Sequence, residues 1–243
     1  MKETYIDSEG FKLWTVTQGS GVAVVLCSGG PGCCDYLAPV ADMLERKAQV
    51  IRFEPRGCGR SEASSDYSVA TSLADLEAVR RHYEVDKWIV MGHSWGADLA
   101  LFYALEHTDH CLGFICMAGG RVHNDREWHR VYAEKRDAGL EPPLDFAYPP
   151  NLDVNKQVNA AWKSSIQRPH LLEEIASLKL PALFVYGSKD IRPRWPVEQV
   201  ANLLPNATFE LLEGADHYLW RSHAKPLESH LRAFVDSLTT ASS

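Results

Sequence analysis

Hydrophobic positions along this chain follow two alternating patterns, which predict strands separated by helices. Short, continuous apolar runs are typical of strands buried on both faces of a sheet. Residues 22–27 form such a continuous run, and strand patterns also occur at residues 48–53, 87–91, 112–118, 180–187 and 208–212. Apolar residues at helical spacing lie between them, at residues 35–46, 68–83, 94–107, 195–204 and 224–238. We therefore predict an α/β fold with a mostly parallel central sheet flanked by helices.

Two regions depart from this rhythm. Residues 2–19 alternate with a period of two around Ser8-Glu9-Gly10 and predict an opening β-hairpin. Residues 120–178 are rich in charge, aromatic residues and proline. Helical patterns occur there at about 125–138, 153–167 and 169–178. We expect this segment to be a small helical cap or lid, inserted into a core formed by residues 1–119 and 179–243.

One stretch combines a strand, a sharp turn and a helix. The apolar run before Gly92 leads into Gly92-His93-Ser94-Trp95-Gly96, and a helical pattern follows. Glycines on both sides of a serine permit a turn so tight that any side chain there would collide with the flanking strand or helix. The hydroxyl then stands exposed at the N-terminus of the helix, where the helix dipole favours negative charge. Ser94 is therefore the candidate nucleophile.

Later strand ends supply partners for this serine. A serine hydroxyl needs a base to accept its proton, and the base needs an acid to orient it. Asp190 follows the apolar run at 180–187, and His217 follows the run at 208–212. We expect Ser94, His217 and Asp190 to form a catalytic triad.

Other candidates for these roles are weaker. Glu54 is the alternative acid because it too ends a predicted strand, whereas Asp216 is adjacent to His217 and poorly placed to meet its ring. His93 neighbours the serine, but its side chain should leave the turn in another direction. Most of the remaining histidines fall on predicted surface helices or in the 120–178 segment.

Backbone N–H groups near Ser94 can form an oxyanion hole. One donor is the N–H of Trp95, which follows the nucleophile, and the other comes from the turn Gly29-Gly30, with Gly30 preferred. The ring of Trp95 either lines a substrate pocket or packs in the core. Asp98, one helical turn after Ser94, is favoured by the helix dipole and is also a candidate to bind a substrate amine.

Composition and charge exclude several classes of protein. The formal charge of −7 argues against nucleic acid as a partner. No apolar stretch approaches the roughly 20 residues needed to span a bilayer, and the N-terminal residues lack the apolar core of a signal peptide. The 6 cysteines show no metal-ligand spacing. We expect a cytoplasmic protein with no metal, cofactor or membrane partner, whose oligomeric state the sequence does not indicate.

The motifs together resemble the α/β-hydrolase superfamily, and within it the proline iminopeptidases. That group typically carries His-Gly-Gly-Pro-Gly, Asp-Gln-Arg-Gly-x-Gly-x-Ser and Gly-Gly-Ser-Trp-Gly. The matching stretches here are residues 28–32, 54–61 and 92–96. Ser28, Glu54 and Pro55 replace the usual His, Asp and Gln, and the predicted cap is shorter than in the family. The resemblance implies the same triad and the same oxyanion donors.

The sequence thus predicts a serine hydrolase that forms an acyl-enzyme and acts on a small molecule or short peptide. By resemblance, removal of an N-terminal residue such as proline is the first activity to consider. Candidate substrate-binding residues are Gly29, Asp98, Glu127 and Trp128; Glu134, Glu141 and Asp145 could also supply carboxylates for a free amine. The alternatives are a carboxylesterase, lactonase or carbon–carbon-bond hydrolase on the same triad, and a ligand receptor or regulatory protein with little turnover.

Overall fold

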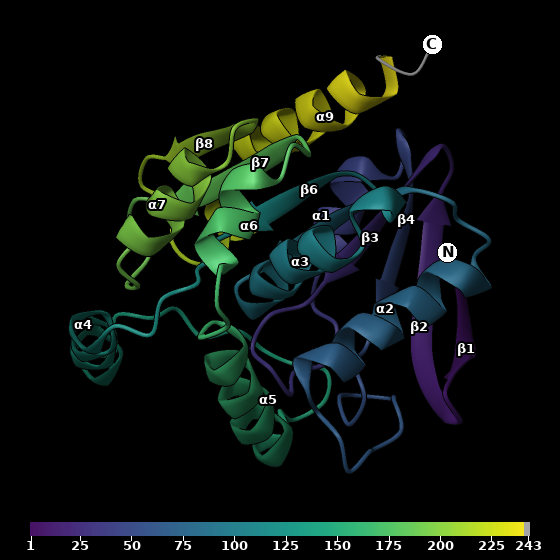
Figure 1. The fold of residues 1–243 in the computed structure, drawn as a ribbon, viewed down its shortest axis with the longest axis horizontal. Coiled ribbons are helices and arrows are strands. Elements are labelled where there is room, and N and C mark those ends of the chain that lie inside the picture. Colours follow the sequence, from purple (N-terminus) through teal and green to yellow (C-terminus); the bar gives the residue numbers. More distant parts are fainter. Residues whose placement is uncertain (241–243) are drawn as a thin grey trace.

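Eight strands form a single sheet in the computed structural model, which describes residues 1–240 (Figure 1). Their order across the sheet is β1-β2-β4-β3-β5-β6-β7-β8. The strands are β1 (Lys2–Ser8), β2 (Phe11–Gly19), β3 (Val22–Cys27), β4 (Ala48–Phe53), β5 (Trp88–His93), β6 (Cys111–Met117), β7 (Ala182–Gly187) and β8 (Ala207–Leu212). The β1–β2 and β2–β4 pairs are antiparallel and all the others are parallel, which confirms the predicted sheet.

Helices cover both faces of this sheet. They are α1 (Ala38–Leu44), α2 (Val69–His82), α3 (Trp95–Glu106), α4 (Arg126–Asp137), α5 (Leu152–Ser165), α6 (Leu171–Ser177), α7 (Trp195–Leu203), α8 (Leu219–Ser222) and α9 (Ala224–Thr240). A short 3-10 helix, η1 (Thr108–His110), precedes β6. Figure 1 shows α2 and α3 in front of the sheet and α9 behind it.

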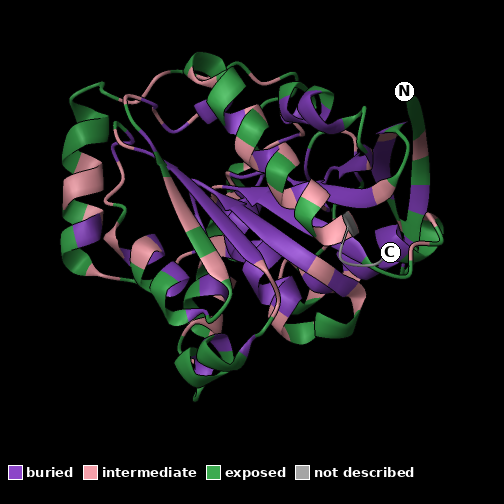
Figure 2. Cartoon of the chain, turned by 90° about the horizontal axis from the view of Figure 1, so that it is seen from above, coloured by how far each residue is buried: buried purple, intermediate pink, exposed green. Residues whose placement is uncertain are grey.

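The alternation of side chains along each strand divides the core into two layers. On β5, Val90 belongs to the cluster beneath α2, α3 and α7, whereas Ile89 and Met91 belong to the cluster beneath α1 and α9. Successive side chains of a strand point to opposite faces, so both faces must be apolar when helices cover both. Figure 2 shows the central strands almost wholly buried.

The predicted and observed elements differ at a few points. The helix expected from residue 35 begins at Ala38, because the Asp35 carboxylate accepts the N–H of Leu37 in a turn and Pro39 has no N–H to donate to the residue 35 carbonyl. The elements η1 and α8 were not predicted. Both are shorter than the window over which helical periodicity can be recognised.

Three helices, α4, α5 and α6, lie between β6 and β7, within the predicted cap segment. The N-terminus of α5 is hydrogen-bonded to two glycine-rich loops of the core. Asn151 donates its N–H to the Gly32 carbonyl (2.8 Å) and its side-chain amide to the Gly57 carbonyl (3.0 Å). Asn155 donates its amide to the Pro31 carbonyl (2.8 Å). The loops after β3 and β4 are therefore held from above by α5, and the cap boundaries stay a prediction.

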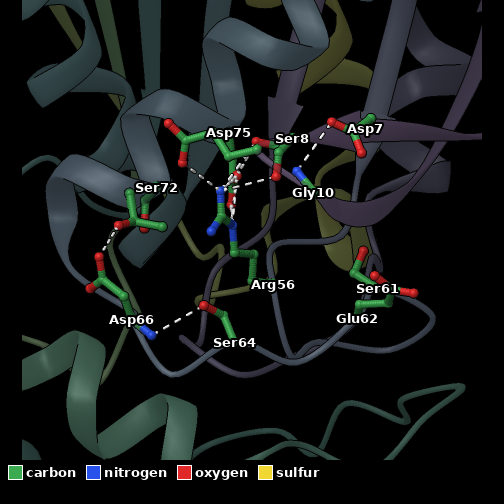
Figure 3. A network of polar contacts seen from close by, with 12 residues as sticks. Asp7, Ser8, Gly10, Arg56, Ser61, Glu62, Ser64, Asp66, Ser72 and Asp75 are labelled. Carbon is green, nitrogen blue, oxygen red and sulfur yellow. Dashed lines mark hydrogen bonds and ion pairs between the residues drawn. The ribbon is translucent and has the colours of Figure 1, made fainter.

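A buried ion pair fastens the loop after β4 to the rest of the core (Figure 3). Arg56 Nε lies 2.9 Å from Oδ1 of Asp75 on α2, and Arg56 Nη2 also donates to the Ser8 carbonyl at the end of β1 (3.3 Å). The Ser8 hydroxyl donates to the same carboxylate (2.6 Å). Arg56 and Asp75 are both almost fully buried, so each charge depends on the other for its stability.

We predict that Asp75→Ala lowers the free energy of unfolding by about 3–5 kcal/mol, because it leaves the buried Arg56 guanidinium with the exposed Glu9 carboxylate as its remaining counter-charge. Urea denaturation of the purified variants measures this. Glu9→Gln is the matched control: Glu9 also pairs with Arg56 but is 69% exposed, so we expect a loss below about 1 kcal/mol. Equal losses of unfolding free energy in the two variants would contradict the conclusion that the buried Arg56–Asp75 pair is the important one.

Candidate active site

Ser94 occupies a strained backbone position between β5 and α3. Its φ is 55° and its ψ is −123°, a conformation that is rare for a residue with a side chain. Its N–H donates to the Met117 carbonyl at the end of β6 (2.8 Å), and its carbonyl accepts the N–H of Ala97 (2.9 Å). These two bonds hold the residue in the strained geometry, which costs about 1–3 kcal/mol.

Close backbone contacts explain the glycines around this turn. A Cβ at Gly92 would collide with the carbonyl of Gly96, and a Cβ at Gly96 would collide with the carbonyl of Cys27 on β3. The helix α3 can therefore start directly against the ends of β3 and β5 only because both positions lack a side chain. This arrangement brings the first residues of α3 and the loop after β3 together.

His217 and Asp190 lie together at the ends of β8 and β7. The His217 Nδ1 and the Asp190 Oδ2 are 2.6 Å apart, and both side chains are buried. The second carboxylate oxygen, Oδ1, accepts the backbone N–H of Arg192 (3.0 Å) and a bond from its guanidinium (3.3 Å). Burial opposes ionisation of Asp190, but the charges and hydrogen bonds of His217 and Arg192 outweigh it and lower the pKa of the carboxyl to about 2.

The Asp190 carboxylate thus fixes the histidine tautomer. Because it accepts the Nδ1 proton, the Nε2 of neutral His217 is left as an acceptor. The Ser94 hydroxyl has no hydrogen-bond partner among residues 1–240. Bonds between a catalytic serine and histidine often tighten only when a substrate binds.

A chain of hydrogen bonds through His93 connects the serine turn to both neighbouring loops. His93 Nε2 donates to the carbonyl of His217 (2.9 Å), and its Nδ1 lies 2.7 Å from the hydroxyl of Tyr36. Burial, followed by the nearby His217, holds the pKa of His93 well below its usual value, so its Nδ1 accepts the Tyr36 proton. The Tyr36 oxygen in turn accepts the N–H of Gly29 (2.7 Å).

Two backbone N–H groups lie unpaired beside the serine. Neither the N–H of Gly30 nor that of Trp95 has an acceptor among residues 1–240. Gly30 has a φ of 57° and lines the same cavity as Ser94 and Trp95. The N–H of Gly29, by contrast, is already bonded to Tyr36. Of the two glycines, Gly30 is therefore the one whose N–H is free to donate to a bound oxyanion.

A cavity of about 350 Å³ opens over Ser94. Its walls include the predicted residues Gly30, Trp95, Asp98 and Trp128, together with Arg121, Arg136 and Arg192. Glu127 does not line it: its carboxylate is 63% exposed and is paired with Arg130 on the outer side of α4. Gly29 is not part of this cavity wall, and a Cβ there would collide with the His93 carbonyl and the Ser94 side chain.

Asp98 connects the helix after the serine to the loop after β6. Its Oδ1 accepts the backbone N–H groups of Gly120 (2.8 Å) and Arg121 (3.0 Å). Burial raises the pKa of the Asp98 carboxyl to about 6, and the Arg121 charge and these two N–H groups offset only part of the rise. The carboxylate therefore shapes the cavity wall by holding the loop that carries Arg121.

Glu54, the alternative acid, serves the loop architecture instead. Its buried carboxylate pairs with Arg60 and accepts the backbone N–H of Asp35 (3.1 Å). It makes no contact with a histidine among the described residues.

Three side chains at this site were missed by sequence reasoning: Tyr36, Arg121 and Arg192. All three stand in loops or at helix starts, where periodicity carries no information about side-chain direction. Arg192 had one weak signal, because it lies two residues after the candidate acid. Its guanidinium also bonds Tyr132 and Glu141, so it joins Asp190 to the segment between β6 and β7.

Residues 1–240 contain no cluster of three or more His, Cys, Asp or Glu side chains arranged to hold a metal ion. Within the same residues, every helix is too short or too polar to cross a membrane.

The chain is similar in sequence to known proteins. A family model described as the alpha/beta hydrolase fold matches residues 22–148. The proline iminopeptidase of Saccharolobus solfataricus is 38% identical over 114 residues, which are 45% of this chain and 36% of that protein. The match thus spans about a third of the length of such relatives.

Two solved structures are similar over nearly the whole chain. A proline iminopeptidase from Mycobacterium smegmatis superposes with a TM-score of 0.76 at 13% identity and 100% coverage of both chains. A thermophilic esterase from Thermogutta terrifontis gives a TM-score of 0.75 at 19% identity, covering 98% of this chain and 99% of that one. At such low identities the likeness concerns the fold alone.

We predict that Asp98 makes stability fall as pH rises. Its pKa is about 6 in the folded state and about 3.9 in an unfolded chain, so between these values the folded state binds more protons. The stability advantage of wild type over Asp98→Asn should drop by about 2–3 kcal/mol between pH 4 and pH 7. Urea denaturation across this range measures it.

Asp66→Asn is the control, because the hydrogen bonds of Thr71 and Ser68 lower the pKa of exposed Asp66. The contribution of Asp66 should be small and change with pH in the opposite direction. A pH-independent difference between wild type and Asp98→Asn would rule out the raised pKa.

Proposed function

Because the chain belongs to the alpha/beta hydrolase fold family, as its motifs predicted, we propose that it is a serine hydrolase acting on small carboxylic esters. The observation that carries this proposal is Ser94 itself: a strained, half-buried serine opening onto a cavity at the junction of β5 and α3. The likeness to proline iminopeptidases, also predicted from the motifs, supports the same chemistry.

In the proposed reaction Ser94 attacks the substrate carbonyl while the Nε2 of His217 takes the hydroxyl proton. Asp190 holds the imidazole by its Nδ1 proton and stabilises the imidazolium that forms. Collapse of the tetrahedral intermediate expels the leaving group, which takes the proton from His217. A water molecule, activated by the same histidine, then hydrolyses the acyl-enzyme and regenerates Ser94.

The N–H groups of Gly30 and Trp95 bind the oxyanion of each intermediate in this scheme. Tyr36 acts as a positioning residue: it fixes Gly29, and hence the adjoining Gly30 turn, against His93. His93 in turn supports the loop of His217 through its bond to the His217 carbonyl. One hydrogen-bonded chain therefore sets the relative positions of oxyanion hole, nucleophile and base.

Release of an N-terminal residue is the second candidate function, favoured by the match to proline iminopeptidases. It requires a carboxylate to hold the free amine of the substrate. The four acidic residues considered from the sequence, Glu127, Glu134, Glu141 and Asp145, all lie outside the cavity wall. Asp98 is the single carboxylate on that wall among the described residues, and three arginines share it. The charge of the cavity therefore supports an ester substrate over a cationic peptide.

We further propose that the protein works in the cytoplasm without a metal or cofactor. Every role in the reaction above is filled by a side chain or backbone group of this chain. A lactonase or carbon–carbon-bond hydrolase would use the same residues, with the difference confined to the substrate.

We predict that the protein hydrolyses short-chain para-nitrophenyl esters and that Ser94→Ala lowers kcat at least about a thousandfold, because no other group can form the acyl-enzyme. Release of para-nitrophenol measures both. Prolyl para-nitroanilide, assayed in parallel, should be turned over far more slowly than the esters.

Faster turnover of the prolyl amide, lost in Ser94→Ala, would replace the ester proposal by the peptidase one. Absence of Ser94-dependent turnover of either substrate, combined with stoichiometric phosphonylation of Ser94, would favour a ligand receptor with little turnover.

We predict that Tyr36→Phe lowers kcat roughly tenfold with little change in KM, because loss of one hydrogen-bond acceptor releases Gly29 at the oxyanion loop. Steady-state kinetics on a para-nitrophenyl ester test this. Tyr83→Phe is the matched control: its hydroxyl bonds Thr15 (2.8 Å) away from the cavity, and kcat should not change. An effect on KM alone would argue against positioning of the oxyanion hole.

A further inference from the structure

Arg121 stands at the entrance of the segment between β6 and β7, on the wall of the cavity over Ser94. It follows the Gly119-Gly120 pair, and its backbone N–H is held by the Asp98 carboxylate. No motif points to this residue, and the serine chemistry described above does not use it. Its side chain nevertheless lines the same cavity as the nucleophile.

Two indole rings contact the Arg121 guanidinium. Its Cζ lies 4.1 Å from the ring centroid of Trp128 on α4 and 4.4 Å from that of Trp162 on α5. Trp128 is itself fixed, because its Nε1 donates to the Pro193 carbonyl (2.9 Å). Stacking of this kind orients the guanidinium and stabilises the cation without neutralising its charge.

The other two arginines of the cavity already have carboxylate partners. Arg192 is paired with Asp190 and Glu141, and Arg136 is paired with Asp137. Arg121 differs from both, since no carboxylate oxygen of residues 1–240 lies within ion-pair distance of it. Its charge is the one on the cavity wall that lacks a direct partner.

The hydrogen-bonding edge of this guanidinium is only partly used. Nη1 donates to the His123 carbonyl. The other nitrogens, Nε and Nη2, have no partner in the described part of the chain, and neither is sealed away from solvent. Burial lowers the pKa of Arg121, with the Asp98 charge opposing the shift, so a bound anion would be favourable.

We propose that Arg121 binds a carboxylate on the acyl part of the substrate, so that the preferred substrates are monoesters of dicarboxylic acids. This inference rests on the serine hydrolase function proposed above. With its cation against two indole rings, the guanidinium still has in-plane N–H groups to donate, and a planar carboxylate matches them with two parallel hydrogen bonds. A free ammonium group at the same place would be repelled.

A structural role for Arg121 gives a different expectation. The cation could serve only to offset the buried Asp98 carboxylate at longer range. In that case its replacement would change stability without changing the choice between charged and neutral substrates. The two readings are separated by measuring selectivity rather than total activity.

The experiment compares para-nitrophenyl monoesters of succinic, glutaric and adipic acid with neutral esters in which an isopropyl group replaces the carboxylate. Rates in Ser94→Ala are subtracted to remove spontaneous hydrolysis. We expect kcat/KM for the best carboxylated ester to exceed that of its neutral counterpart by about tenfold or more. In Arg121→Gln this ratio should fall to about one or below, and in Arg121→Lys it should be intermediate.

Arg136→Gln is the matched control, because Arg136 lines the same cavity but is half-exposed and already paired. It should keep the wild-type ratio. A ratio of one or less in the wild type, or a wild-type ratio retained in Arg121→Gln, would overturn the proposal.

A binding measurement separates this proposal from the serine chemistry. Monomethyl glutarate should raise the Tm of the Ser94→Ala protein more than methyl 5-methylhexanoate does, and this difference should vanish when Arg121→Gln is added. The result does not depend on turnover. If carboxylate binding is found but no ester is hydrolysed, the proposed function fails and the anion site stands. If esters are hydrolysed without carboxylate selectivity, the proposed function stands and the anion site fails.

Discussion

The close approach of α3 to the ends of β3 and β5 is the constraint on which the site depends. Gly92 and Gly96 allow backbone to touch backbone there, and the Ser94 conformation follows from that contact. A relaxed turn would move the first N–H of α3 away from the loop that carries Gly30. The local strain of one residue thus creates an unpaired donor, an exposed hydroxyl and a helix N-terminus at a single point.

Sequence reasoning recovered the features that local pattern determines. Apolar runs located the strands, and the two glycines located the turn of Ser94. His217 and Asp190 were accessible because parallel strands end at one edge of the sheet, and the structure places them 2.6 Å apart. Tyr36 and Arg121 were not accessible, because a loop side chain takes its direction from residues distant in the sequence. Glu127 failed for a reason visible in its own helix: it shares an outer stripe with Arg130 and Glu134.

The family match and the charge of the cavity wall give different information about the molecule. The family match covers residues 22–148, which include the glycine-rich loops and the serine turn but end before α5. The match therefore includes the Ser94 turn, whereas Asp190 and His217 lie outside it. Among the described residues, the cavity wall carries three arginines and one carboxylate, whereas binding of a free amine requires negative charge. Arg121 and Arg136 of that wall lie within the matched residues, so the shared fold and the charge of the cavity are carried by overlapping segments.

The hydrogen bonds of Asn151 and Asn155 divide the segment between β6 and β7 into two kinds of structure. These residues hold the loops after β3 and β4, so α5 belongs functionally to the catalytic frame although it lies outside the sheet. Among residues 1–240, no hydrogen bond joins helix α4 to those loops; it contributes Trp128 to the cavity and accepts a bond from Arg192 through Tyr132. Exchange of α4 alone would therefore alter the cavity and leave the loops after β3 and β4 held in place, whereas replacement of the whole segment would also release those loops.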